Sequence, residues 1–246
     1  MVAVFANLCF YSPKEKKPDK PFTSHIFLQF NTVVGPRQFF LGSTYINSFG
    51  ESFSISKFKY YVSNIEFGNP VSGAKEFIPG SYYLINESDS VSRKISIDIT
   101  GSSYTTVSFL LGVDSLKNVS GAQGGALDPV NDMFWTWNTG YVMAKLEGNS
   151  PFSRQIHHAI EYHVGGFKGE NSVLQKIDLV IPAENSLPVK RNLKMIIDVD
   201  LIQWFKGMHD LPISGNAACT SPGQLAKQFS ENYRAMFKVQ SVTSEE

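Results

Sequence analysis

Apolar and polar residues alternate along much of the chain, which is the pattern of strands with one buried face. The segment 25–34, HIFLQFNTVV, places Ile26, Leu28 and Phe30 on one face. The parity of the apolar residues changes within FKYYVSNIEF (58–67), which indicates a β-bulge near Ser63 and Asn64. The same patterns predict further strands at 38–46, 81–86, 94–100, 105–113, 134–138, 140–148, 159–166, 174–182 and 192–201.

Helical periodicity is expected near the C-terminus. Ser221 reads as an N-cap, with Pro222 at the first helical position and Gln224 at the third. An apolar stripe at helical spacing follows, made of Leu225, Phe229, Tyr233 and Met236. A final strand is expected at 237–242, FKVQSV.

Many short strands separated by turn residues predict an all-β fold, an antiparallel β-sandwich with a short C-terminal helix. Its topology would be a Greek key of the immunoglobulin-like type or a jelly roll. A loop at 112–131, rich in Gly, Asn and Ser, is long enough to be functional or mobile. No internal repeat or interior linker is visible, so residues 22–246 are expected to form a single domain.

Composition supports a folded, exported β-protein. Hydrophobic residues make up 42% of the 246 residues and aromatic residues 13%, enough for a substantial core. The 22 basic residues balance the 22 acidic ones, so the charge expected of a nucleic-acid-binding protein is missing. Charged residues make up only 18%, below the roughly 25% of typical soluble domains. The sequence also has no apolar run of the length that a transmembrane helix needs.

The N-terminal segment 1–21 is expected to be a signal-peptide remnant and linker. Its apolar start, MVAVFANLCFYSP, is followed by the charged, proline-containing KEKKPDKP. Cys9 is a candidate for lipid attachment, although Leu8 before it is larger than the small residue usual there. The expected location is therefore the periplasm, the cell envelope or the cell exterior, with a lipid anchor as one form. The alternative is a cytosolic N-terminus with a short apolar strand.

Familiar catalytic motifs are missing. The sequence contains no Walker loop, GxSxG, HExxH or CxxC pair, and its glycine-rich stretches do not open a helix after a strand. Because no activated nucleophile or acid–base pair can be named, a non-enzymatic protein is expected.

Two short stretches carry candidate binding chemistry. In DMFWTW (132–137), Trp135 and Trp137 share a face if the segment is a strand; they are either core residues or part of a site such as a stacking platform for sugar rings. In RQIHHAIEYHVGG (154–166), three histidines lie within seven residues, and His163 would share a strand face with Glu161. Imidazoles suit copper and zinc, whereas the alternative is an exposed polar face of an edge strand.

Five stretches, in this order, resemble a known family: KYYVSNIEF (59–67), FLLGVDSLKN (109–118), GGALDPVNDMFWTWNTGYVMAKLEG (124–148), EYHVGG (161–166) and NYRAMFKV (232–239). They are similar to the MbnP-like family, the methanobactin-associated periplasmic copper proteins. The resemblance extends from about residue 22 to 240, and the stretch 124–148 is its most specific part.

The resemblance implies an exported β-sandwich that functions in copper binding or homeostasis. Related surface proteins hold copper with histidines and a kynurenine, which forms when a di-haem cytochrome-c-peroxidase-like partner oxidises a tryptophan. At the matching positions, Trp135 or Trp137 would be the modified tryptophan and His163 the first histidine ligand. His25 and His209 would be further ligands.

This sequence departs from the family pattern at two positions. Residue 137 is Trp where copper-binding relatives carry His, and the first-strand stretch FNT (30–32) lacks the histidine of many relatives. One expected ligand is therefore missing. The competing interpretation is a non-enzymatic extracellular module that binds carbohydrate or protein on the same sandwich, without a metal.

Overall fold

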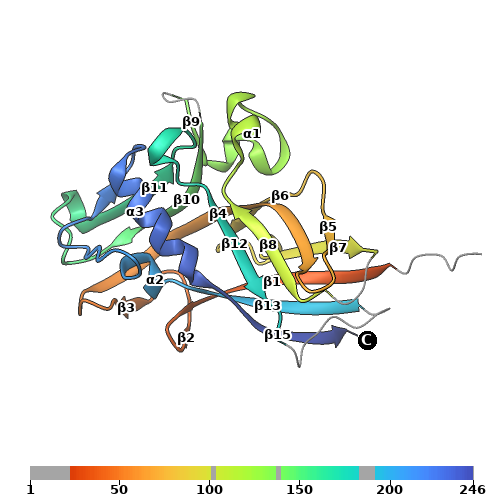
Figure 1. Ribbon diagram of the computed structural model, residues 1–246. Coiled ribbons are helices and arrows are strands. Elements are labelled where there is room, and N and C mark those ends of the chain that lie inside the picture. The colour runs from red at the N-terminus through yellow and green to blue at the C-terminus, as the bar shows by residue number, and fades with distance from the viewer. Residues whose placement is uncertain (1–22, 101–103, 137–139, 183–191, 246) are drawn as a thin grey trace, which may run out of the picture.

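The computed structural model describes residues 23–100, 104–136, 140–182 and 192–245. The predicted signal-peptide remnant with Cys9 lies outside these residues, and so does Trp137. The described part of the chain forms two β-sheets (Figure 1). None of its helices is long and apolar enough to cross a membrane.

The smaller sheet has five strands. Its order is β15 (Phe237–Glu245), β13 (Asn192–Asp200), β1 (Ser24–Val34) and β2 (Arg37–Gln38), and β7 (Lys94–Ile99) also pairs with β1. Alternate residues of β1 are buried, which confirms the face predicted from Ile26, Leu28 and Phe30. Phe30 reaches across to the other sheet, where its ring meets Tyr60 at 6.1 Å and Phe109 at 6.0 Å between centroids. The core therefore lies between the two sheets, as in a sandwich.

The larger sheet has ten strands. Its order is β12 (Gln175–Val180), β8 (Thr106–Leu111), β4 (Ser52–Asn69), β10 (Gly140–Asn149), β11 (Ala159–Gly165) and β14 (Ala218–Cys219). The short strands β3 (Thr44–Ile46), β5 (Ala74–Phe77) and β6 (Tyr82–Asn86) pair with β4, and β9 (Phe134–Trp135) pairs with β10. Strand β4 contains the predicted bulge, because its register with β8 shifts between Ser63 and Glu66 and Asn64 has a positive φ of 53°.

Three short α-helices complete the described structure: α1 (Ser115–Val119), α2 (Ile202–Phe205) and α3 (Gln224–Tyr233). Helices α2 and α3 contact each other, and α3 contacts β11 at one end of the sandwich (Figure 1). The predicted all-β class with a short C-terminal helix is confirmed. Two pairings, β1 with β13 and β11 with β14, are parallel within this mostly antiparallel arrangement. Their direction could not follow from alternation, because each pair joins segments far apart in the chain.

Two details of the sequence prediction are wrong. Helix α3 begins at Gln224 with Gly223 as its N-cap, so Ser221 does not cap it. Pro222 packs instead against the end of β11, where a methyl group on Gly166 would lie 3.1 Å from its Cβ. The predicted strand 38–46 is also interrupted between β2 and β3, at a turn where Gly42 has a φ of 79°.

Candidate functional site

His163 lies in a grid of charged side chains on the outer face of the larger sheet. In the strand register, Lys145 of β10 is opposite both His163 of β11 and Lys59 of β4. One step along, Glu147 is opposite Glu161 and Lys57. Directly opposed residues share a face, so these side chains form two adjacent rows. The neighbouring Tyr162 and Val164 are buried on the inner face, which confirms the predicted shared face of His163 and Glu161.

A chain of hydrogen bonds and ion pairs joins this grid to the residue that begins DMFWTW. His163 Nε2 lies 2.8 Å from Glu147 Oε1, and Lys57 Nζ lies 3.1 Å from Glu147 Oε2. Lys57 Nζ also lies 2.9 Å from Asp132 Oδ2, while Asp132 Oδ1 lies 3.0 Å from Lys145 Nζ. Lys145 is only 4% exposed, so Asp132 neutralises an ammonium group that is almost fully buried.

The electrostatics of the grid keep both acidic groups ionised. The hydrogen bond with His163 outweighs the effect of burial and lowers the pKa of Glu147 to about 2. Burial raises the pKa of Asp132, but hydrogen bonds from Lys57 and Lys145 outweigh it and lower the value to about 2. Because ionised Glu147 can only accept, the Nε2 of His163 donates to it. In the neutral imidazole, Nδ1 is then the nitrogen with a free lone pair.

The loop before DMFWTW covers part of this outer face. It contains two 3₁₀ segments, Gly125–Leu127 and Pro129–Asn131. The phenol of Tyr61 donates to the carbonyl of Ala126 at 3.1 Å, and the phenol of Tyr141 donates to that of Leu127 at 2.8 Å. Lys59 Nζ donates to the carbonyl of Asn131 at 2.9 Å. These three hydrogen bonds fasten the loop to β4 and β10.

Trp135 lies on this same outer face because β11 has a glycine beneath it. A methyl group on Gly165 would lie 2.6 Å from Cζ3 and 2.7 Å from Cη2 of the indole, closer than atoms can approach. Gly165 and His163 are two residues apart on one strand, so they share a face with about 6.6 Å between their Cα positions. The indole of Trp135 therefore lies over Gly165, two residues along β11 from His163, and Trp135 is only 7% exposed.

The edge of Trp135 borders a small hollow of about 190 Å³. Phe167, Lys168 and Pro222 form part of its wall. Two interpretations of Trp135 were drawn from the sequence, and its burial agrees with core packing. The part of the residue that lines the hollow could still touch a small ligand there.

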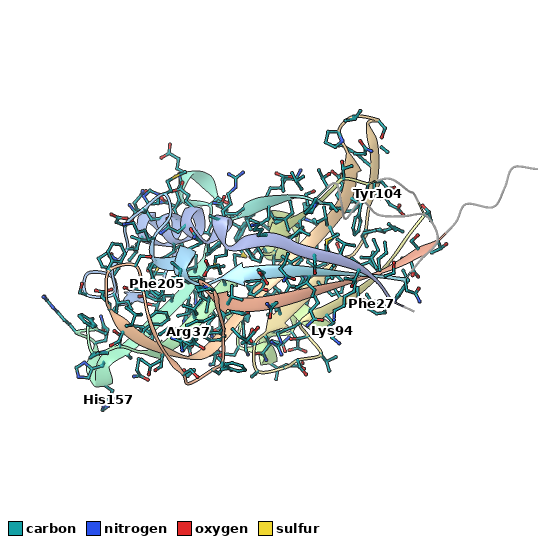
Figure 2. The ribbon with its side chains drawn as sticks, turned by 90° about the horizontal axis from the view of Figure 1, so that it is seen from below. Phe27, Arg37, Lys94, Tyr104, His157 and Phe205 are labelled. Atoms are coloured by element: carbon teal, nitrogen blue, oxygen red, sulfur yellow. The ribbon has the colours of Figure 1, made fainter. Side chains whose placement is uncertain are left out.

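The other two candidate histidines lie elsewhere. His25 on β1 contacts Asp98 at 2.6 Å through Nδ1 and Ser96 at 2.8 Å through Nε2. His209 contacts Glu231 at 2.5 Å. Figure 2 shows that Phe27, which stacks edge-on with His25, and Phe205 of α2, near His209, lie toward different ends of the molecule. Within the described ranges, no group of three or more His, Cys, Asp or Glu residues could hold a metal ion.

Several members of this grid were not identified from the sequence. The strand register brings together the ion pairs of four residues, Lys57, Asp132, Lys145 and Glu147. This register cannot be read from one sequence. The i, i+2 spacing of Lys145 and Glu147 in KLEG was the only local signal, since it places both side chains on one strand face.

These features define the class of protein as an all-β sandwich whose larger sheet carries His163 in a grid of charged side chains and a tryptophan packed over Gly165 on the same strand. The MbnP family model matches residues 23–221, and the chain belongs to the MbnP family. Its structure is similar to that of MbnP from Methylosinus trichosporium, with a TM-score of 0.57 and 14% sequence identity over 91% of this chain and 99% of that chain. At this identity, the similarity concerns the fold. No curated protein matches the chain.

Proposed function

We propose that this MbnP-family protein is an exported copper-binding protein whose site lies on the outer face of β11. The observation that carries the proposal is the absence of a side chain at Gly165, which allows the indole of Trp135 to lie over β11 two residues from His163. Copper leads the divalent metals in its affinity for imidazole ligands. The low charge content and the apolar N-terminal segment support export, with Cys9 as the candidate lipid anchor.

The described residues do not complete a copper site on their own. They offer the Nδ1 of His163 and the carboxylate of Glu147, and the ammonium groups of Lys57 and Lys145 lie close to that carboxylate. The proposal therefore assigns the remaining donors to the segment from Trp135 to Trp137. Indole is a poor ligand, whereas the amine and carbonyl of a kynurenine are suitable donors. A di-haem peroxidase-like protein is the proposed partner that would oxidise the tryptophan.

A titration of the tag-free protein with Cu⁺ and Cu²⁺ tests the proposal. Binding tighter than about 1 µM, roughly −8 kcal/mol, is expected for protein isolated from its native host. The His163→Ala variant should lose this binding, while His25→Ala and His209→Ala should keep it, because their side chains have separate partners. Equal binding by the His163→Ala variant would refute the site assignment, and an intact mass without conversion of a tryptophan would refute the kynurenine.

The second candidate is a non-enzymatic binding module for carbohydrate or protein, and the hollow beside Trp135 favours it. An indole edge and the Phe167 ring form an apolar wall, and Lys168 adds a donor. This candidate predicts glycan binding that is lost in Phe167→Ala and unchanged by chelators. Copper binding that requires His163, with no glycan binding, would count against it. Both candidates are binding functions.

A further inference from the structure

The β10–β11 loop carries two adjacent histidines with an unusual backbone conformation. His157 and His158 have positive φ values of 57° and 55°. For a residue with a side chain, this left-handed conformation costs about 1–2 kcal/mol of conformational free energy. Histidine adopts it more often than most other residues. The described residues with positive φ are eleven glycines and four others, so this chain usually places glycine where the backbone requires such a turn.

The other two exceptions use their side chains. Asn64 donates to Asp114 at 3.3 Å, and Asp132 joins Lys57 and Lys145. We expect the imidazole side chains of the two histidines to have a function as well, because glycine could adopt the same backbone conformation without strain.

Hydrogen bonds hold the backbone of both histidines and the ring of His158. The amide of Asn149 donates to the carbonyl of His157 at 3.0 Å, and the backbone N–H of Ser150 donates to the carbonyl of His158 at 2.9 Å. His158 Nδ1 lies 3.0 Å from the carbonyl oxygen of Ser153. Because a carbonyl can only accept, this nitrogen carries the proton, and Nε2 of the neutral ring keeps its lone pair. A second-shell hydrogen bond of this kind is what orients a histidine that binds a metal.

Both histidines line the same hollow, which has a volume of about 440 Å³. Its other walls come from β3, the start of β4 and the end of β10, and include the hydroxyl residues Thr44, Ser52 and Ser54. Among the described residues, no Lys, Arg, Asp or Glu lines it, so no described ammonium group repels a cation there. A carboxylate contacts each of the other three histidines, His25, His163 and His209. His157 and His158 are exposed at the loop tip instead. His157 projects from one end of the molecule (Figure 2).

We propose that His157 and His158 form a second site, separate from that of His163, for a divalent transition metal such as Cu²⁺ or Zn²⁺. Two imidazole nitrogens would bind the metal, and water and the nearby hydroxyl groups would occupy its other positions. Because no carboxylate or third histidine joins the pair among the described residues, binding is moderate and readily reversible. Such a site suits the capture and transfer of a metal ion at the surface.

Calorimetric titration of the tag-free full-length protein with ZnCl₂ and CuSO₄ tests this site. The double variant His157→Asn, His158→Asn removes both imidazoles and keeps residues that tolerate positive φ, so it should fold like the wild type. We expect it to lose one equivalent of metal that binds with a dissociation constant below about 100 µM. A His25→Asn variant is the matched control and should lose none.

The His163→Ala variant separates this proposal from the proposed function. It should retain the equivalent that depends on His157 and His158, even if no copper binds near Trp135. Addition of Zn²⁺ should shift the Nε2 resonance of His158 in imidazole ¹⁵N spectra and leave Nδ1 protonated. Two results would overturn the second site. One is an equal metal stoichiometry in the wild type and the double variant. The other is a His163→Ala variant that retains no equivalent of bound metal.

Discussion

Replacing Gly165 by alanine tests the contact that places the indole of Trp135 over β11, two residues from His163. The added methyl group would lie 2.6 Å and 2.7 Å from two indole carbons and 2.9 Å from the carbonyl oxygen of Tyr141. The indole would have to move, because the backbone carbonyl of Tyr141 is held in the sheet and cannot move away from the methyl group. Overpacking of a filled site costs about 1–3 kcal/mol. In a domain of this size each kcal/mol lowers Tm by about 2–4 °C, so we expect a decrease of about 2–12 °C.

Chemical and thermal unfolding of Gly165→Ala measures this cost. Gly124→Ala is the control, because a methyl group there meets no atom within 4 Å, and its stability should stay within about 0.5 kcal/mol of the wild type. In a double-mutant cycle, Trp135→Phe should reduce the cost of Gly165→Ala, with a coupling energy above about 0.5 kcal/mol. A Gly165→Ala variant as stable as the control, or a cycle without coupling, would show that the indole does not lie on Gly165.

Three further predictions concern the charged grid and the buried cysteine. Asp132→Asn should destabilise the protein by about 1–3 kcal/mol in urea unfolding, because it leaves the buried Lys145 with Glu147 at 3.8 Å as its remaining ion-pair partner; a neutral effect would contradict the grid. The pKa of Glu147 is lowered to about 2. The ionised carboxylate therefore contributes fully to the free energy of unfolding above its usual pKa, and this contribution is lost as pH falls from about 4.5 toward 2. The stability difference between the wild type and Glu147→Gln should therefore shrink over that interval, and a constant difference would refute this linkage. Burial raises the pKa of the Cys219 thiol to about 11, so native Cys9→Ser protein should react with a thiol reagent at pH 8 only after unfolding; rapid reaction in the folded state would disprove its burial.

Local patterns predicted the strands well, because alternation depends on residues close together in the sequence. The bulge near Asn64 is an example, since the change of parity in YVSNIEF reflects one extra residue in the strand. The start of α3 was misplaced because Pro222 packs against Gly166, a contact between segments distant in the chain. The candidate site follows from the sequence only in part for the same reason: His163 and Trp135 are candidates in the sequence, whereas the lysines and acids around His163 are recognised only through the strand register.

The sequence by itself determined the all-β class and the inward and outward faces of the strands, since these depend on periodicity, and five of its stretches resemble the MbnP family. Only the tertiary structure decided which strands are neighbours and which side chains therefore meet. It placed Trp135 over Gly165, joined His163 to Asp132 through Glu147 and Lys57, and separated His25 and His209 from them. The physical reason is that strand register and partner choice come from packing across the whole core, which no local stretch contains.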